Sequence, residues 1–191
     1  EFLSGVYQGK TTGTALTLMI RNQNTRSGDY AKTQDLLRPG HADYTAYAKY
    51  EGYQDARGGG HFSGRITAAS VAAGAVCEGV LQSLGVRVYT HIAACGGVQD
   101  APLSSAAGLL LPEPEPGHFA LLDPEKEAAM QQAIREAGAQ GDSVGGILET
   151  VVTGLPAGVG EPWFDSVESE LSHLMFAIPA CKGVEFGAGF A

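Results

Sequence analysis

The chain has 191 residues, 44% of them hydrophobic and 17% charged, which is enough apolar material for a packed core and excludes a disordered protein. The formal net charge of −9 argues against a nucleic-acid partner, because duplex-binding surfaces are broadly basic. No apolar run approaches the roughly 20 residues of a membrane span, and the start EFLSGVYQGK lacks the basic and apolar regions of a signal peptide, so we expect no membrane partner.

Cysteine and histidine spacing gives no sign of a disulfide frame or a metal site. The three cysteines are widely spaced and form no CxxC pair, which is typical of reduced thiols in a cytoplasmic protein (Cys77, Cys95 and Cys181). Three of the histidines are isolated from other ligand residues, so no catalytic metal is predicted (His91, His118 and His173). The absence of an initiator Met indicates a processed or excised piece.

The first quarter of the chain predicts strands, a long loop and a short helix. Residues 2–8 and 14–21 have strand patterns, and GKTTG between them predicts a hairpin connection. A phosphate-binding P-loop is disfavoured, because Ser4 stands where its first glycine belongs and a strand pattern follows. Residues 22–42 predict an exposed loop. The tyrosines that follow at every third position favour a short helix with one packed aromatic face over an aromatic ligand cage (Tyr44, Tyr47, Tyr50 and Tyr53).

The rest of the chain mixes helices and strands. We expect a helix over 64–84, a strand over 86–93, a loop over 100–122, a helix from Asp123 to about Gly138, a strand over 142–154, a helix within 164–179 and a last strand from Val184. Asp123 is predicted to cap its helix, and Asp165 with Glu168 resembles a capping box. The pattern predicts one α+β domain over 1–191, with helices packed on largely antiparallel sheet.

Positive charge is concentrated at the front of this acidic chain. Residues 1–65 carry a net charge of +2 and residues 66–191 carry −11. A basic pocket in an acidic body suits a small anion, although an uneven scatter of Lys and Arg is an equally good explanation.

The stretch ARGGGHFSGR (56–65) has the composition of an anion site. Three consecutive glycines let backbone N–H groups approach a ligand closely, and Ser63 is placed to cap the helix that follows. Arg57 and Arg65 flank the loop, and each can bind a carboxylate or phosphate through two N–H groups. The alternative is a purely structural glycine-rich turn.

The stretch RPGHADY (38–44) sets Arg38 and His41 around a Pro-Gly turn. Histidine is the side chain whose proton exchanges near neutral pH, and beside an arginine it tends to stay neutral. The pair would therefore serve as a binding group and a proton carrier for a charged ligand. The alternative is a turn histidine bonded to backbone. Together the two loops predict one polyanionic ligand.

Ordered motifs along the whole chain resemble the chorismate synthase family. They are SGVYQGKTTGT, IRN, RSGDY, RPGHADYTAYAKY, RGGGHFSGRITAASVAAGAV, GDSVGG, GLPAGVGEPWFD and IPACKGVEFGAGF. The resemblance implies conversion of 5-enolpyruvylshikimate 3-phosphate to chorismate and phosphate, with reduced FMN, in the shikimate pathway of aromatic amino acid biosynthesis. It also implies a cytoplasmic homotetramer and a β-α-β sandwich with central helices between largely antiparallel sheets.

The resemblance also implies roles for individual residues. His41 matches the family's catalytic histidine near the flavin, and Arg38 and Arg65 match substrate-binding arginines. Four consecutive residues match the loop along FMN (His61, Phe62, Ser63 and Gly64). His61 and Phe62 stand where Arg-Ser is commoner in the family. Because a histidine is charged only part of the time at neutral pH, we expect His61 to bind a ligand anion less strongly than an arginine would.

Family members are about twice as long as this chain. The resemblance places a second catalytic histidine in a GESHG-like motif before this region, and a flavin loop, a Lys-Pro-Thr-Pro segment and an Arg-x-Asp pair after it. We therefore expect the isolated chain to be inactive. The alternatives are a non-catalytic flavin- or phosphate-binding module and a self-assembling structural module.

Overall fold

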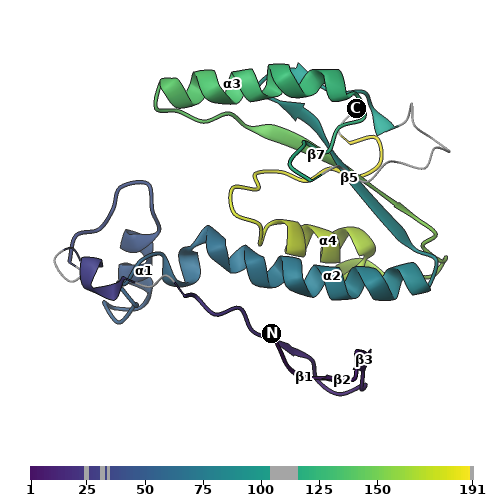
Figure 1. Cartoon of the computed structure of the whole chain (residues 1–191), viewed down its shortest axis with the longest axis horizontal. Helices are drawn as coiled ribbons and strands as arrows, with labels where there is room; N and C mark the ends of the chain where they lie inside the picture. Colours follow the sequence, from purple (N-terminus) through teal and green to yellow (C-terminus); the bar gives the residue numbers. More distant parts are fainter. Residues whose placement is uncertain (24–25, 31–32, 34, 104–115, 190–191) are drawn as a thin grey trace. The chain divides into compact units, whose positions relative to one another are not determined.

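A computed structural model of the chain describes residues 1–23, 26–30, 33, 35–103 and 116–189. It contains two compact units, which are described separately (Figure 1). Unit 1 comprises residues 1–77 and 158–191, and unit 2 comprises residues 78–157. The mixture of helices and antiparallel strands confirms the α+β class. A single domain over 1–191 stays a prediction.

Unit 1 begins with two short antiparallel pairs in place of the two longer strands expected. β1 pairs with β4 and β2 with β3 (Phe2–Ser4 with Thr17–Leu18, Val6–Tyr7 with Lys10–Thr11). The hairpin turn lies at Gln8 and Gly9, before most of the predicted GKTTG connection. The Ser4 hydroxyl donates to the Ala15 carbonyl and accepts from the Thr17 hydroxyl, both at 2.9 Å, and so links β1 to the chain around β4.

The short helix α1 spans Asp43–Lys49 and follows the polar segment that contains a 3-10 turn at Ser27–Tyr30. Its buried residue is Ala46, with 2% of its surface exposed. The expected aromatic packing is wrong, because all four tyrosines of the three-residue repeat are exposed, up to 90% for Tyr53. The buried residue of α1 is therefore the small Ala46, not one of the tyrosines.

Helix α2 (Thr67–Ser83) follows 3-10 turns at Gly60–Phe62 and Gly64–Ile66, as expected for residues 64–84. By length and composition alone the helical stretch Gly64–Ser83 could cross a membrane, so the expectation that no apolar run reaches this length is wrong. Buried core helices of soluble proteins pass the same test, but none of this window is buried within the part of the chain that the structure describes. The segment contains two charged residues, Arg65 and Glu78.

Helix α4 (Val167–Met175) is capped one residue away from the predicted position. The Ser166 hydroxyl accepts a hydrogen bond from Ser169 N at 3.2 Å, so the expected capping box of Asp165 and Glu168 is wrong. Asp165 instead lies in a 3-10 turn at Trp163–Asp165. The last strand expected from Val184 is also wrong, since no strand pairing occurs within residues 176–189.

Unit 2 is a three-stranded antiparallel sheet with one helix. The strand order is β6-β5-β7, formed by Val98–Gln99, Arg87–Cys95 and Gly146–Thr153. Helix α3 (Glu127–Ala139) lies along the sheet, and Ala133 approaches Gly96 so closely that a Cβ there would be 2.6 Å from its methyl group (Figure 1). The predicted cap is confirmed, because Asp123 accepts from Glu125 N at 3.1 Å before the 3-10 turn Pro124–Lys126.

A buried histidine joins the sheet to the chain beside it. His91 is 4% exposed and lies opposite Glu149 in the β5–β7 register. Its Nδ1 and Nε2 lie 2.9 Å from Asp100 Oδ2 and Glu149 Oε2, so each ring nitrogen faces a carboxylate oxygen. Asp100 also accepts from Leu122 N and Asp123 N, and Glu149 from Leu103 N. These bonds attach Leu103 on one side and Leu122 and Asp123 on the other side to the cluster. Within the expected loop over 100–122, residues 104–115 lie outside the described residues.

The carboxylates of this cluster ionise more readily than usual. Burial would raise the pKa of Asp100, but hydrogen bonds from Leu122 N, His91 and Asp123 N outweigh it and the pKa is lowered. The hydrogen bond from His91, then that from Leu103 N, lowers the pKa of Glu149. The cluster is therefore a stabilising element at neutral pH.

We predict that His91→Ala lowers the free energy of unfolding by about 3 kcal/mol, because it leaves the buried Asp100 without its charged partner. Urea unfolding at neutral pH measures the difference. The matched control is His173→Ala, at an exposed position of α4. It should change the free energy of unfolding by no more than about 0.5 kcal/mol. Equal midpoints for the two variants would contradict the role of the cluster.

Candidate functional site

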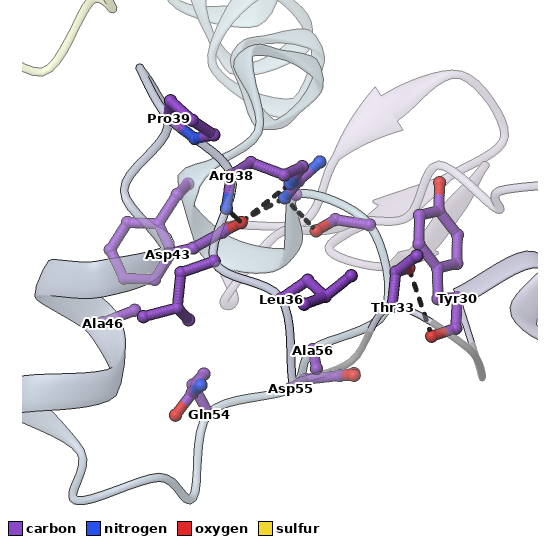
Figure 2. Close-up of a pocket in the computed structure, with 14 residues that line it drawn as sticks. Tyr30, Thr33, Leu36, Arg38, Pro39, Asp43, Ala46, Gln54, Asp55 and Ala56 are labelled. Carbon is purple, nitrogen blue, oxygen red and sulfur yellow. Dashed lines mark hydrogen bonds and ion pairs between the residues drawn. The ribbon is translucent and has the colours of Figure 1, made fainter.

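The two glycine-marked loops meet in unit 1 through the guanidinium of Arg38 (Figure 2). Arg38 Nε donates to Asp43 Oδ2 at 2.8 Å, and Nη2 donates to Asp43 Oδ1 at 2.9 Å. The same Nη2 donates to the carbonyl of Gly58 at 2.9 Å. One side chain thus links residues 38–43 to the start of the GGGHFSGR loop. These are the two loops that were predicted from the sequence to bind one ligand.

Asp43 is the common partner of Arg38 and His41. Besides the guanidinium, it accepts from Arg38 N at 2.9 Å, and its Oδ1 lies 2.5 Å from His41 Nδ1. The side-chain and backbone hydrogen bonds from Arg38, joined by that from His41, hold the pKa of Asp43 well below its usual range. The alternative of a histidine bonded to backbone is wrong, since the imidazole contacts the Asp43 carboxylate and the Arg38 guanidinium.

The glycine-rich loop is built around Ser63. The Ser63 hydroxyl accepts from Arg65 N at 3.2 Å, which confirms the predicted cap. Gly58 and Gly60 have φ of +72° and +49°, and a Cβ on Gly59 would lie 2.7 Å from that of Ser63. The glycines are therefore required for the tight turn itself.

The two arginines that flank this loop differ in their partners. Arg57 donates from Nε and Nη2 to the carboxylate of Asp55, both at 2.8 Å, and this pair lowers the pKa of Asp55 to about 2. Arg65 makes no side-chain hydrogen bond or ion pair with the described residues. The expectation that both arginines are available to an anion therefore applies to Arg65, whereas Arg57 is already engaged by a carboxylate.

A pocket of about 340 Å³ lies beside the Arg38–Asp43 pair (Figure 2). Leu36, Leu37 and Phe62 give it apolar walls, and Arg38 and Asp43 give it a charged edge. Its lining also includes Gln54, whose Oε1 is buried with no hydrogen-bond partner among the described residues. The pocket combines an aromatic surface with charged groups of both signs, because Arg38 lies in the lining together with Asp43 and Asp55.

The structure brings together Arg38, His41 and the loop that starts at Gly58, with Phe62 in the same pocket as Arg38. His61 lies near Asp55 and contributes to the lowering of the pKa of that carboxylate, and Ser63 and Gly64 form the start of the following helix. The sequence analysis missed the two carboxylates, although Asp43 and Asp55 stand within or beside the quoted motifs. An acidic residue two positions from His41 and five from Arg38 was the available signal.

These features define an α+β protein with a pocket of apolar walls and a charged edge next to a carboxylate-bound histidine. A model of the chorismate synthase family matches residues 1–191, and the chain belongs to this family. A chorismate synthase from Chitinophaga pinensis is 47% identical over 188 residues, and one from Aeropyrum pernix is 45% identical over 193 residues. These alignments cover 98% and 100% of the chain but 48% and 50% of the relatives.

A crystal structure of a chorismate synthase has the same fold, with a TM-score of 0.75 and 29% sequence identity. The superposition covers all of this chain and 55% of that one. The chain thus spans about half the length of the relatives and the solved structure that it matches.

We predict that Gly59→Ala destabilises unit 1 by about 1–3 kcal/mol, because the new methyl group collides with Ser63. Thermal unfolding measures the effect. Gly74→Ala in α2 is the matched control, since its added methyl meets no atom within 4 Å and alanine favours a helix. A Gly59→Ala chain as stable as the control would show that the loop tolerates a side chain at this position.

Proposed function

We propose that this chain forms the central part of a chorismate synthase, a carbon–oxygen lyase of the shikimate pathway. The reaction is the anti-1,4-elimination of phosphate from 5-enolpyruvylshikimate 3-phosphate, in which a C–H and a C–O bond break and chorismate and phosphate form. The observation that carries the proposal is the set of contacts made by the Arg38 guanidinium. They join the histidine loop (residues 38–44) to the glycine-rich loop (residues 56–65) at one pocket. Family membership of all 191 residues supports it.

The residues of this site fit a substrate with one phosphate and two carboxylates. Arg65 has a guanidinium without a partner among the described residues, at the start of the helical stretch that Ser63 caps and that leads into α2. Arg38 is oriented by Asp43 at the edge of the pocket. We assign substrate binding to both arginines. Arg65 can hold an oxyanion through two N–H groups, whereas Arg38 gives Nε and Nη2 to Asp43 and Gly58 and would bind an oxyanion through Nη1.

The same residues fit reduced FMN in two respects. Phe62 offers an aromatic surface in the pocket. In the segment from His61 to Gly64, the N–H groups of Phe62 and Ser63 are bonded to the Gly59 and Gly60 carbonyls, so those of His61 and Gly64 are the backbone donors left for a ligand. Reduced FMN, when bound, supplies the electron density that assists departure of phosphate. In this chain we assign His61, Phe62, Ser63 and Gly64 to cofactor binding.

His41 is the proposed proton carrier. Its Nδ1 faces Asp43, and its Nε2 makes no hydrogen bond with the described part of the chain. With Nδ1 held by a carboxylate, Nε2 is the ring nitrogen left to accept or donate a proton, and the elimination requires such a group because a proton leaves the substrate.

Other properties of the intact protein follow from the family. We propose the β-α-β sandwich with central helices between the sheets, assembly as a homotetramer, and a cytoplasmic location. Segments that precede and follow this region in the family would complete the site, so we propose that the isolated chain has little or no activity.

The test is an anaerobic assay with reduced FMN and 5-enolpyruvylshikimate 3-phosphate that measures both chorismate and phosphate. We expect turnover by the complete protein and none by the 191-residue chain, because removing members of a catalytic unit costs far more than removing one contact. A complete protein that binds FMN without turnover would favour the non-catalytic module. Full turnover by the chain alone would refute its dependence on other segments.

We predict that Arg65→Ala in the complete protein weakens the binding of both FMN and substrate by roughly 1.5–3 kcal/mol each, the value of a charge-assisted hydrogen bond. Equilibrium dialysis or fluorescence titration measures both dissociation constants. Arg57→Ala is the matched control, with a smaller expected loss because Arg57 is already engaged by Asp55. Equal effects of the two substitutions would contradict the assignment of Arg65 as the principal anion-binding residue.

A further inference from the structure

The carboxylate of Asp43 is the partner of four polar contacts from Arg38 and His41. Oδ2 accepts from Arg38 N and Nε at 2.9 and 2.8 Å, and Oδ1 accepts from Arg38 Nη2 at 2.9 Å. Oδ1 also lies 2.5 Å from His41 Nδ1. The side chain of Asp43 is 19% exposed and that of His41 is 28% exposed, so water has limited access to the contact between them.

The partners of His41 Nδ1 decide which ring nitrogen carries the proton in the neutral form. Nδ1 lies 2.5 Å from a carboxylate oxygen, which can only accept, and 3.2 Å from Arg38 Nη2, which can only donate. A ring nitrogen is either a donor or an acceptor, so the two contacts cannot both be hydrogen bonds. The shorter contact, to a charged acceptor, is the stronger one, so Nδ1 carries the hydrogen and Nε2 keeps its lone pair.

We infer that Asp43 is a positioning residue that holds the neutral form of His41 as the Nδ1–H tautomer, with Nε2 as the nitrogen that exchanges protons. The same carboxylate orients the Arg38 guanidinium toward the Gly58 carbonyl. Asp43 therefore fixes the distance between a cationic binding group and a proton carrier. Only the use made of the proton rests on the proposed function, because the tautomer is a property of this loop.

A purely structural role is the competing explanation. Asp43 is the first residue of α1, where a carboxylate interacts favourably with the helix dipole. A structural role predicts that loss of the carboxylate changes stability and leaves the tautomer of His41 unchanged. The state of the imidazole ring therefore separates the two explanations.

The first experiment measures the tautomer by two-bond ¹H–¹⁵N correlation spectra of the ¹⁵N-histidine-labelled chain across neutral and alkaline pH. We expect His41 to be mainly Nδ1–H in the unsubstituted chain and mainly Nε2–H in Asp43→Ala. Asp43→Glu keeps a carboxylate and should restore at least part of the Nδ1–H form. Asp55→Ala is the matched control, because Asp55 holds Arg57 through the same set of arginine donors and lacks a histidine hydrogen bond.

The second experiment measures kinetics in the complete protein. Asp43→Ala should lower kcat by about 10- to 100-fold, as expected for loss of a carboxylate that orients a functional histidine. In a His41→Ala background the same substitution should lower kcat by less than about threefold, because residues that act as a unit are not additive. The effect of Asp43→Ala on KM, which we attribute to the position of Arg38, is measured separately.

The outcomes are distinct. An Nε2–H tautomer in the unsubstituted chain, or an unchanged tautomer in Asp43→Ala, would overturn the inference whatever the activity. A multiplicative loss of kcat in the double variant would overturn it as well. If the complete protein makes no chorismate, the proposed function fails, and the spectra still decide how Asp43 holds the ring.

Discussion

The pairing of Arg38 with Asp43 is the interaction on which the candidate site depends. A guanidinium is planar and presents its donors in a fixed fork, so one arginine can bind a carboxylate edge and a backbone carbonyl in a single orientation. Arg38 uses this geometry to bind Asp43 and Gly58 together. A lysine has a single charged nitrogen and could not hold the two loops in the same relation.

His91 is buried and His41 is half-buried, and they differ in the number of carboxylates that contact the imidazole ring. That number indicates whether a ring nitrogen is left for a ligand. His91 has a carboxylate at each ring nitrogen, so it cannot exchange a proton without losing a hydrogen bond. His41 has one carboxylate partner, at Nδ1. The first arrangement cross-links a sheet, whereas the second leaves a nitrogen for a ligand. Both residues were visible in the sequence, but only their partners distinguish them.

Local signals predicted the parts of the fold that depend on neighbours in sequence. Ser63 and Asp123 cap their helices as expected, because a cap is formed within three residues. The cap of α4 lies at Ser166 instead of Asp165, where two adjacent residues had similar capping ability. The expected last strand failed for a different reason, since a strand requires a pairing partner that the sequence pattern does not name.

The same distinction applies to the site. Glycine composition and charge indicated that the loops at 38–44 and 56–65 belong to one ligand, and the hydrogen bond from Arg38 to Gly58 brings them together. The engagement of Arg57 by Asp55 was not predicted, because an arginine followed by glycines gives no indication of which carboxylate turns toward it. Spacing identified the positive groups, but their pairing depends on backbone geometry.

The bonds around Asp100 and Glu149 also bear on how this region can change in evolution. Leu103 N is fastened to Glu149 and Leu122 N to Asp100, so the sheet holds each flank independently of the residues between them. Leu103 and Leu122 are thus held by the cluster around His91, whatever sequence stands between them. Changes of sequence between these two anchors should therefore have little effect on how the strands pair.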